Sequence, residues 1–202
     1  MIINIEKELD IKLGRIQKLL GRSSLDALLL RQTDNFAWVT CGASSYINRA
    51  DSMGVASVLI TPSTRYVITN NIEAVRLMQE EGLAGQNWEF QISPWYEQKD
   101  VISELTSGMK LGADTFLPNA LDLSCEIASL RSQLTSEEGR RFRELGMLCA
   151  QGMQNAVDAV HPGMTEFEIA GVLSQAVESR GVQSIVNLIA TDERIFSYRH
   201  PL

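Results

Sequence analysis

The longest apolar stripe in the sequence lies between Thr135 and Val160. Its apolar residues recur at three- and four-residue spacing, which predicts a helix with one buried face. Thr135 can cap this helix while Glu138, three residues later, reaches back to the amide of the cap. Pro162 cannot join a helical ladder, so we expect the helix to end just before it. The stripe consists of Phe142, Leu145, Cys149, Met153, Ala156, Val157 and Val160.

A second helix is expected directly after the turn at residues 161–165. Thr165 and Glu168 repeat the capping pattern, and Gly181 is placed as the end of the helix. The following segment, 182–190, is rich in Val and Ile and predicts a strand. The apolar stripe of this second helix consists of Ile169, Val172, Leu173, Ala176 and Val177.

The first 132 residues alternate short apolar runs with helical patterns, which indicates an α/β layer. A helical pattern runs to Gly21, and a buried strand is expected at 25–30. The β-rich runs 55–61 and 66–70 are separated by four turn residues, so they predict an antiparallel hairpin. The remaining patterns predict helices at 72–81, 98–106 and 119–132 and strands at 88–92 and 109–113.

Composition is ordinary for a globular protein and narrows the functional classes. The 202 residues are 45% apolar and 21% charged, which allows one large domain or two. A net charge of -7 argues against nonspecific binding to nucleic acid or to anionic membranes, because both need a basic face. The amino terminus lacks the pattern of a signal peptide, and no apolar run approaches a membrane span. Three widely spaced cysteines are expected to be reduced thiols, which fits a cytoplasmic protein.

Several segments resemble one family. The helix, the Pro-Gly-Met-Thr-Glu turn at 162–166, the second helix and Gly181 resemble the opening of the catalytic domain in pita-bread metallopeptidases. This superfamily comprises Xaa-Pro aminopeptidase, prolidase, methionine aminopeptidase and creatinase. The segments 25–30 and 35–42 are similar to the amino-terminal domain of creatinase, prolidase and Xaa-Pro aminopeptidase, a domain that methionine aminopeptidase lacks. Residues 110–114 match the last strand of that domain loosely.

The resemblance implies an α/β chain with two domains. Residues 1–133 would form a creatinase-like or prolidase-like amino-terminal domain with a mixed sheet flanked by helices. Residues 134–202 would form the start of a pita-bread α+β catalytic domain, which we expect to be truncated because a large domain needs many more residues.

Metal ligands are not expected within this chain. In the family two Asp, one His and two Glu hold the metals, and all lie after or very near the point where the sequence stops. Glu166 and Glu168 are accounted for by the first turn of a helix, where they complement its dipole. Asp192 and Glu193 are adjacent, so in a strand they would point to opposite sides. We therefore predict no metal-binding and no cofactor-binding residue here; two divalent ions (Mn, Co or Zn) are implied only for a complete catalytic domain.

His200 is the one candidate catalytic residue. It falls where family peptidases carry a histidine that contacts substrate near the metals, and such an imidazole can hydrogen-bond a developing anion or transfer a proton. The bulky Tyr198 and Arg199 depart from the small loop usual before that histidine. His161, which precedes Pro162, is interpreted as a polar turn residue.

Two functional classes remain open. The first is a metal-dependent exopeptidase, a hydrolase resembling Xaa-Pro aminopeptidase or prolidase, with the chain as given inactive because the metal-ligand region is missing. The second is a noncatalytic binding or oligomerisation module of the same fold. The resemblance implies a homo-oligomer, a dimer, and a peptide substrate only for the full catalytic domain. Neither nucleic acid nor membrane is an expected partner.

Overall fold

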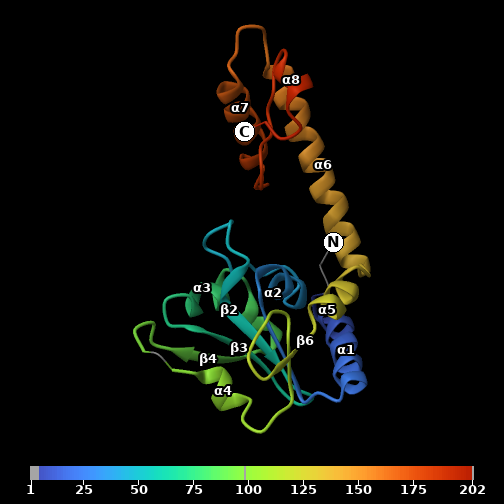
Figure 1. Cartoon of the computed structure of the whole chain (residues 1–202), viewed down its shortest axis with the longest axis vertical. Coiled ribbons are helices and arrows are strands. Elements are labelled where there is room, and N and C mark those ends of the chain that lie inside the picture. Colours follow the sequence, from blue (N-terminus) through green and yellow to red (C-terminus); the bar gives the residue numbers. More distant parts are fainter. Residues whose placement is uncertain (1–4, 98, 202) are drawn as a thin grey trace. The chain divides into compact units, whose positions relative to one another are not determined.

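The computed structural model describes residues 5–97 and 99–201 (Figure 1). Contacts within the chain divide it into two compact units, residues 1–135 and residues 136–202.

The first unit contains a six-stranded mixed sheet with the strand order β4-β3-β2-β1-β5-β6. β2 pairs antiparallel with both β1 and β3, while the pairs β1–β5, β3–β4 and β5–β6 are parallel. The predicted antiparallel hairpin is thus confirmed as β2–β3. The strands are β1 Ala27–Gln32, β2 Met53–Ile60, β3 Arg65–Asn70, β4 Glu89–Ser93, β5 Leu111–Ala113 and β6 Ala120–Asp122.

Helices of the first unit differ from the sequence predictions at several places, and the helix at Thr33–Val39 and the 3-10 turn at Leu83–Gln86 were not predicted. Gly21 lies inside the first helix, which continues until Ser24 adopts a positive φ of 52°. The pattern at 119–132 was not one helix, because its first residues form β6 and the helix begins only at Ser124. The helices are α1 Ile5–Ser23, α2 Thr33–Val39, α3 Ala74–Gln79, the 3-10 turn η1 Leu83–Gln86, α4 Val101–Leu105 and α5 Ser124–Arg131.

Two apolar clusters cover the two faces of the sheet. The larger cluster joins side chains of α1, α2, α3 and α5, such as Ile16, Phe36 and Ile127, to one face of the central strands. The smaller cluster lies on the opposite face, where Ile102 and Leu105 of α4 pack against it. Most of the buried apolar side chains of this unit therefore belong to the larger cluster, on one face of the sheet.

An irregularity in β1 is stabilised by a buried carboxylate. The pairing register of β1 with β2 shifts between Leu30 and Gln32, and β5 ends at Ala113 on the other side of β1, so the amides of Arg31 and Gln32 need other acceptors. Asp114, which follows β5 and is 0% exposed, accepts from the amide of Arg31 at 3.0 Å and from that of Gln32 at 3.0 Å. It also accepts from Nδ2 of Asn35 in α2 at 2.9 Å. One carboxylate thus joins β1, β5 and α2.

The second unit consists of a helical hairpin and an irregular segment. Its helices are α6 Ser136–Ala159, α7 Glu166–Glu178 and the short α8 Arg194–Ser197. α6 and α7 approach closely at Gly152, where a Cβ atom would lie 2.8 Å from Cγ1 of Val177. The strand predicted at 182–190 is wrong, because this segment is irregular. A strand needs a neighbour to pair its backbone groups, and the described part of this unit contains no other strand.

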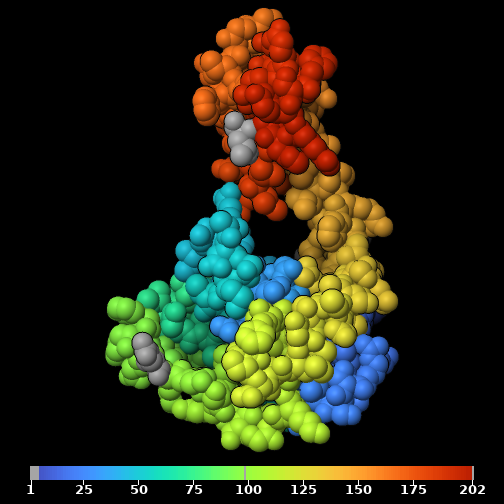
Figure 2. All heavy atoms as spheres, in the orientation of Figure 1, coloured from blue at the N-terminus to red at the C-terminus, as the bar shows by residue number. Residues whose placement is uncertain are grey.

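The expected burial of the α6 stripe is also wrong. Phe142 is 61% exposed and Val157 is 59% exposed, whereas Ala156 is buried. On α7 only Val177 of the predicted stripe is buried, and the others are half-buried. The residues of α6 and α7 run from gold to dark orange in the space-filling view (Figure 2). The described residues therefore leave apolar helix faces without cover.

Among the described residues, no helix is both long and apolar enough to cross a membrane.

Candidate functional site

His200 lies three residues beyond α8 and is exposed. Within residues 5–97 and 99–201, no hydrogen bond or ion pair involves its imidazole. The ring is accessible to a ligand, but the described chain does not bring a second catalytic group to it. Its role as a substrate contact stays a prediction.

Glu166, the first residue of α7, binds the segment that leads to His200. Its Oε1 accepts hydrogen bonds from the backbone amide of Thr191 at 2.9 Å, from the Thr191 hydroxyl at 3.3 Å and from Nε of Arg194 at 2.9 Å. Arg194 also lies over the ring of Tyr198, with 5.1 Å between the guanidinium carbon and the ring centroid. The backbone hydrogen bond from Thr191, followed by the charge of Arg194, lowers the pKa of Glu166. Glu166 therefore fixes the segment that ends in α8.

Glu168 forms the predicted capping box with Thr165, which the structure confirms. Its Oε2 accepts from the backbone amide of Thr165 at 2.7 Å, and the hydroxyl of Thr165 accepts from the amide of Glu168 at 3.3 Å. The hydrogen bond from the Thr165 backbone lowers the pKa of the Glu168 carboxyl. His161 is exposed in the preceding turn, and its Nδ1 lies 3.2 Å from the carbonyl oxygen of Pro162. These contacts account for the turn without a ligand.

The donor set does not fit the metal pair that the family resemblance implies. In the described ranges 5–97 and 99–201, no group of three or more His, Cys, Asp or Glu side chains could hold a metal ion. Glu166 is engaged by Thr191 and Arg194, and Glu168 by the capping box. Asp192 and Glu193 are both exposed at the turn before α8. No catalytic step through a metal follows from these residues.

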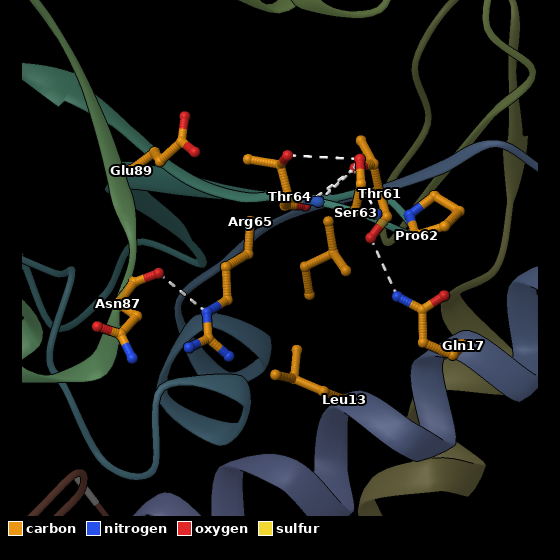
Figure 3. A pocket seen from close by; sticks show the side chains of 10 residues that line it. Leu13, Gln17, Thr61, Pro62, Ser63, Thr64, Arg65, Asn87 and Glu89 are labelled. Atoms are coloured by element: carbon orange, nitrogen blue, oxygen red, sulfur yellow. Dashed lines mark hydrogen bonds between the residues drawn. The ribbon is translucent and has the colours of Figure 1, made fainter.

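A polar pocket of about 320 Å³ lies between α1 and the β2–β3 turn (Figure 3). Gln17 of α1 donates from Nε2 to the carbonyl of Thr61 at 3.0 Å, which joins the helix to the turn. Arg65 donates from Nε to the carbonyl of Asn87 at 3.1 Å, while the carboxylate of Glu89 points away from the guanidinium in Figure 3. Because these polar groups bind backbone carbonyls, their hydrogen bonds stabilise the turn. The lining of the pocket offers no pair of groups for acid–base chemistry.

Solved structures of peptidases share this fold. The prolidase from Pyrococcus horikoshii is 17% identical and superposes with a TM-score of 0.65 over 84% of this chain and 48% of its own. The Xaa-Pro aminopeptidase from Thermotoga maritima is 18% identical, with a TM-score of 0.60 over 84% of this chain and 49% of its own. The Xaa-Pro dipeptidase from Bacillus anthracis is 16% identical, with a TM-score of 0.60 over 85% and 49% respectively.

The chain thus spans about half the length of the solved structures that it matches. At this identity the likeness establishes the fold alone. The resemblance to prolidase and Xaa-Pro aminopeptidase, seen first in the sequence, is thus confirmed for the fold. No family model matches the sequence, and no curated protein matches it either.

Proposed function

We propose that this chain is the amino-terminal half of a metal-dependent exopeptidase of the prolidase and Xaa-Pro aminopeptidase type. Residues 1–133 are its creatinase-like amino-terminal domain, and residues 134–202 are the opening of its pita-bread catalytic domain. The observation that carries the proposal is the superposition on such peptidases over 84% of this chain but 48% of the prolidase. We propose a cytoplasmic location, because the three cysteines are far apart in the sequence and would stay reduced there.

The chain of 202 residues is proposed to be inactive by itself. Hydrolysis of this type needs a metal ion, held by several converging ligands, that activates a bound water. Among the described residues, no group of side chains could hold such an ion. His200 is proposed to contact substrate only once the metal-binding region is present. In that complete enzyme, manganese, cobalt or zinc would supply the activated water.

An assay with Xaa-Pro dipeptides and Xaa-Pro-containing tripeptides tests both statements. The purified 202-residue chain should give no turnover with manganese, cobalt or zinc, whereas protein purified from the native source should give turnover that a chelator abolishes. Chelator-sensitive turnover by the 202-residue chain would contradict its inactivity. A native protein without any such activity would contradict the proposed function.

A noncatalytic binding or assembly module is the second candidate. It is favoured by the bulky Tyr198 and Arg199 beside His200 and by the exposed apolar side chains of α6. The intact mass of the native protein discriminates between the two candidates. A mass near twice 22.4 kDa supports the exopeptidase, and a native mass of 22.4 kDa supports the module.

Self-association into a dimer is proposed for either candidate. The exposed apolar faces of α6 and α7 favour association, because large uncovered apolar patches usually mark interfaces. Light scattering over a wide range of protein concentration is the test. A monomer mass at every concentration would contradict the dimer.

A further inference from the structure

Among residues 5–97 and 99–201, no strand pairs with the outer edge of the sheet at β4. β4 is the terminal strand in the order β4-β3-β2-β1-β5-β6, and it pairs only with β3. It contains no lysine, no proline and no register shift, three of the devices that protect an edge from pairing, and its one charged residue is Glu89 at the start of the strand. Its exposed Ile92, at 46%, adds an apolar side chain to this edge.

The pairing with β3 determines which backbone groups of β4 point outward. The carbonyl of Ser93 accepts from the amide of Asn71 at 3.0 Å, so Ser93 directs its backbone groups toward β3. Because strand residues alternate, Glu89 and Gln91 do the same, whereas Phe90 and Ile92 direct their N–H and C=O groups away from the sheet. Among the described residues, no backbone hydrogen bond outside the strand pairing involves Phe90 or Ile92.

We infer that β4 is the dimer interface, where two copies of this chain pair their β4 strands antiparallel about a two-fold axis at Gln91. In this register Phe90 of one copy faces Ile92 of the other. Each such pair exchanges two N–H···O bonds, so the interface contains about four. The inference rests on the self-association proposed for this chain, but it places the contact on β4 and not on the apolar faces of α6 and α7.

A second copy suits this edge because β4 is complementary to itself in that register. Glu89 faces Ser93 of the second copy, so no like charges meet. Phe90 and Ile92 lie on the sheet face of the larger apolar cluster, against which Phe90 already packs, and their pairing would continue that face. Shifting the register by two residues toward the carboxyl end would bring Pro94, which has no N–H, opposite Phe90. The register centred on Gln91 uses all five residues of β4 and no others.

A cysteine at the two-fold axis tests the register. Two Gln91 residues would form a non-hydrogen-bonded pair with Cα atoms about 4.5 Å apart, which is within the range of a disulfide. The variant Gln91→Cys should therefore become a covalent dimer on mild oxidation. Glu89→Cys is the matched control, because it lies on the same face of the same strand, yet its two copies would be about 13 Å apart. Peptide mapping distinguishes a bridge at position 91 from one through the exposed Cys125 or Cys149.

A charged substitution tests the same edge by association. Ile92→Lys should convert the dimer to monomer in light scattering, with an unchanged circular dichroism spectrum as the check on folding. Leu121→Lys on β6, the opposite edge strand, is the control because Leu121 is 50% exposed, and it should leave the dimer intact.

Three outcomes would overturn the inference. One is a dimer that persists with folded Ile92→Lys. Another is a bridge at position 89 as readily as at position 91, and the third is a dimer in which Gln91→Cys fails to bridge. All three leave the proposed self-association standing, whereas a monomer at all concentrations contradicts both statements.

Discussion

Replacing Asp114 by alanine should destabilise the first unit more than any change of a surface carboxylate. The side chain is 0% exposed and accepts from Arg31 N, Gln32 N and Asn35 Nδ2 at 2.9–3.0 Å. A hydrogen bond to a charged group contributes about 1.5–3 kcal/mol, so three such bonds amount to roughly 4.5–9 kcal/mol. Water that enters the space left by the carboxylate can satisfy some of the donors. We therefore expect Asp114→Ala to lower the free energy of unfolding by about 4 kcal/mol.

Two control variants separate the buried network from the loss of a carboxylate as such. Asp114→Asn keeps one acceptor oxygen for the backbone amides but turns an NH2 group toward donors, so it should cost about half as much. Asp26→Ala removes an exposed carboxylate that accepts from the amide of Lys110 at 2.8 Å. It should cost no more than about 1 kcal/mol, because solvent can replace that single bond.

Urea unfolding followed by tryptophan fluorescence is the measurement. Trp38, Trp88 and Trp95 are the three tryptophans of the chain, and all belong to the first unit, so their signal reports on that unit alone. The free energies come from linear extrapolation. If Asp114→Ala unfolds within about 1 kcal/mol of the unchanged chain, the three donors find equivalent acceptors without Asp114, and our account of the β1 irregularity is wrong.

Three further predictions concern the second unit. Gly152→Ala should weaken the α6–α7 contact, because its Cβ would lie 2.8 Å from a side-chain atom of α7; a lower thermal midpoint of this unit by circular dichroism is the check. Thr165→Ala should cost about 0.5–2 kcal/mol through loss of the cap. His161→Ala should cost less, because its ring is exposed and solvent screens its interactions with the Pro162 carbonyl and the Glu168 carboxylate; urea unfolding compares the two variants. The lowered pKa values of Glu166 and Glu168 stabilise the fold above the unfolded value of 4.5, and this contribution is lost as the pH falls through the lowered values. In a carboxyl NMR titration, Thr165→Ala should therefore raise the midpoint of Glu168 and leave that of Glu166 unchanged.

Local signals were sufficient where the interacting residues are close in sequence. The capping box at Thr165 and Glu168 depends on groups three positions apart, and the structure has it as predicted. The β2–β3 hairpin is likewise fixed by two apolar runs and the turn between them. In these cases the physics that determines the element is contained in a few consecutive residues.

Interactions between distant segments could not be predicted in this way. Glu166 was assigned to the helix dipole, but it binds Arg194, 28 positions further along the chain. The spacing from Thr165 identifies Glu168 as the capping residue, but nothing in the sequence around Glu166 points to Arg194 as its partner. Asp114 is a similar case, because its need arises from an irregularity in β1, 83 positions earlier.

The predicted burial of the α6 stripe and the predicted strand at 182–190 failed for a different reason. Periodicity and β propensity report what a segment suits, and the outcome depends on partners that complete the contact. The described part of the second unit supplies neither a neighbouring strand nor a cover for Phe142. The patterns are those of buried elements, and the unit as described leaves them at its surface.

The β4 dimer should be strongly dependent on Trp95. About four backbone hydrogen bonds contribute roughly 2–6 kcal/mol, and two cross-strand apolar pairs add at most about 2 kcal/mol. Association costs at least about 4 kcal/mol, so the strands alone would give a dissociation constant no tighter than about 1 mM. Trp95 lies two residues beyond β4, is 65% exposed and makes an edge contact with Tyr96, so it is placed to bury a large apolar ring against the second copy. Trp95→Ala should therefore raise the dissociation constant of the dimer at least about tenfold in sedimentation equilibrium, the effect of about 1.4 kcal/mol. Ile47→Ala, which removes an equally exposed apolar side chain (68%) from the 43–52 loop, should leave it unchanged. Equal effects of the two substitutions would show that apolar exposure in general, and not the β4 edge, drives association.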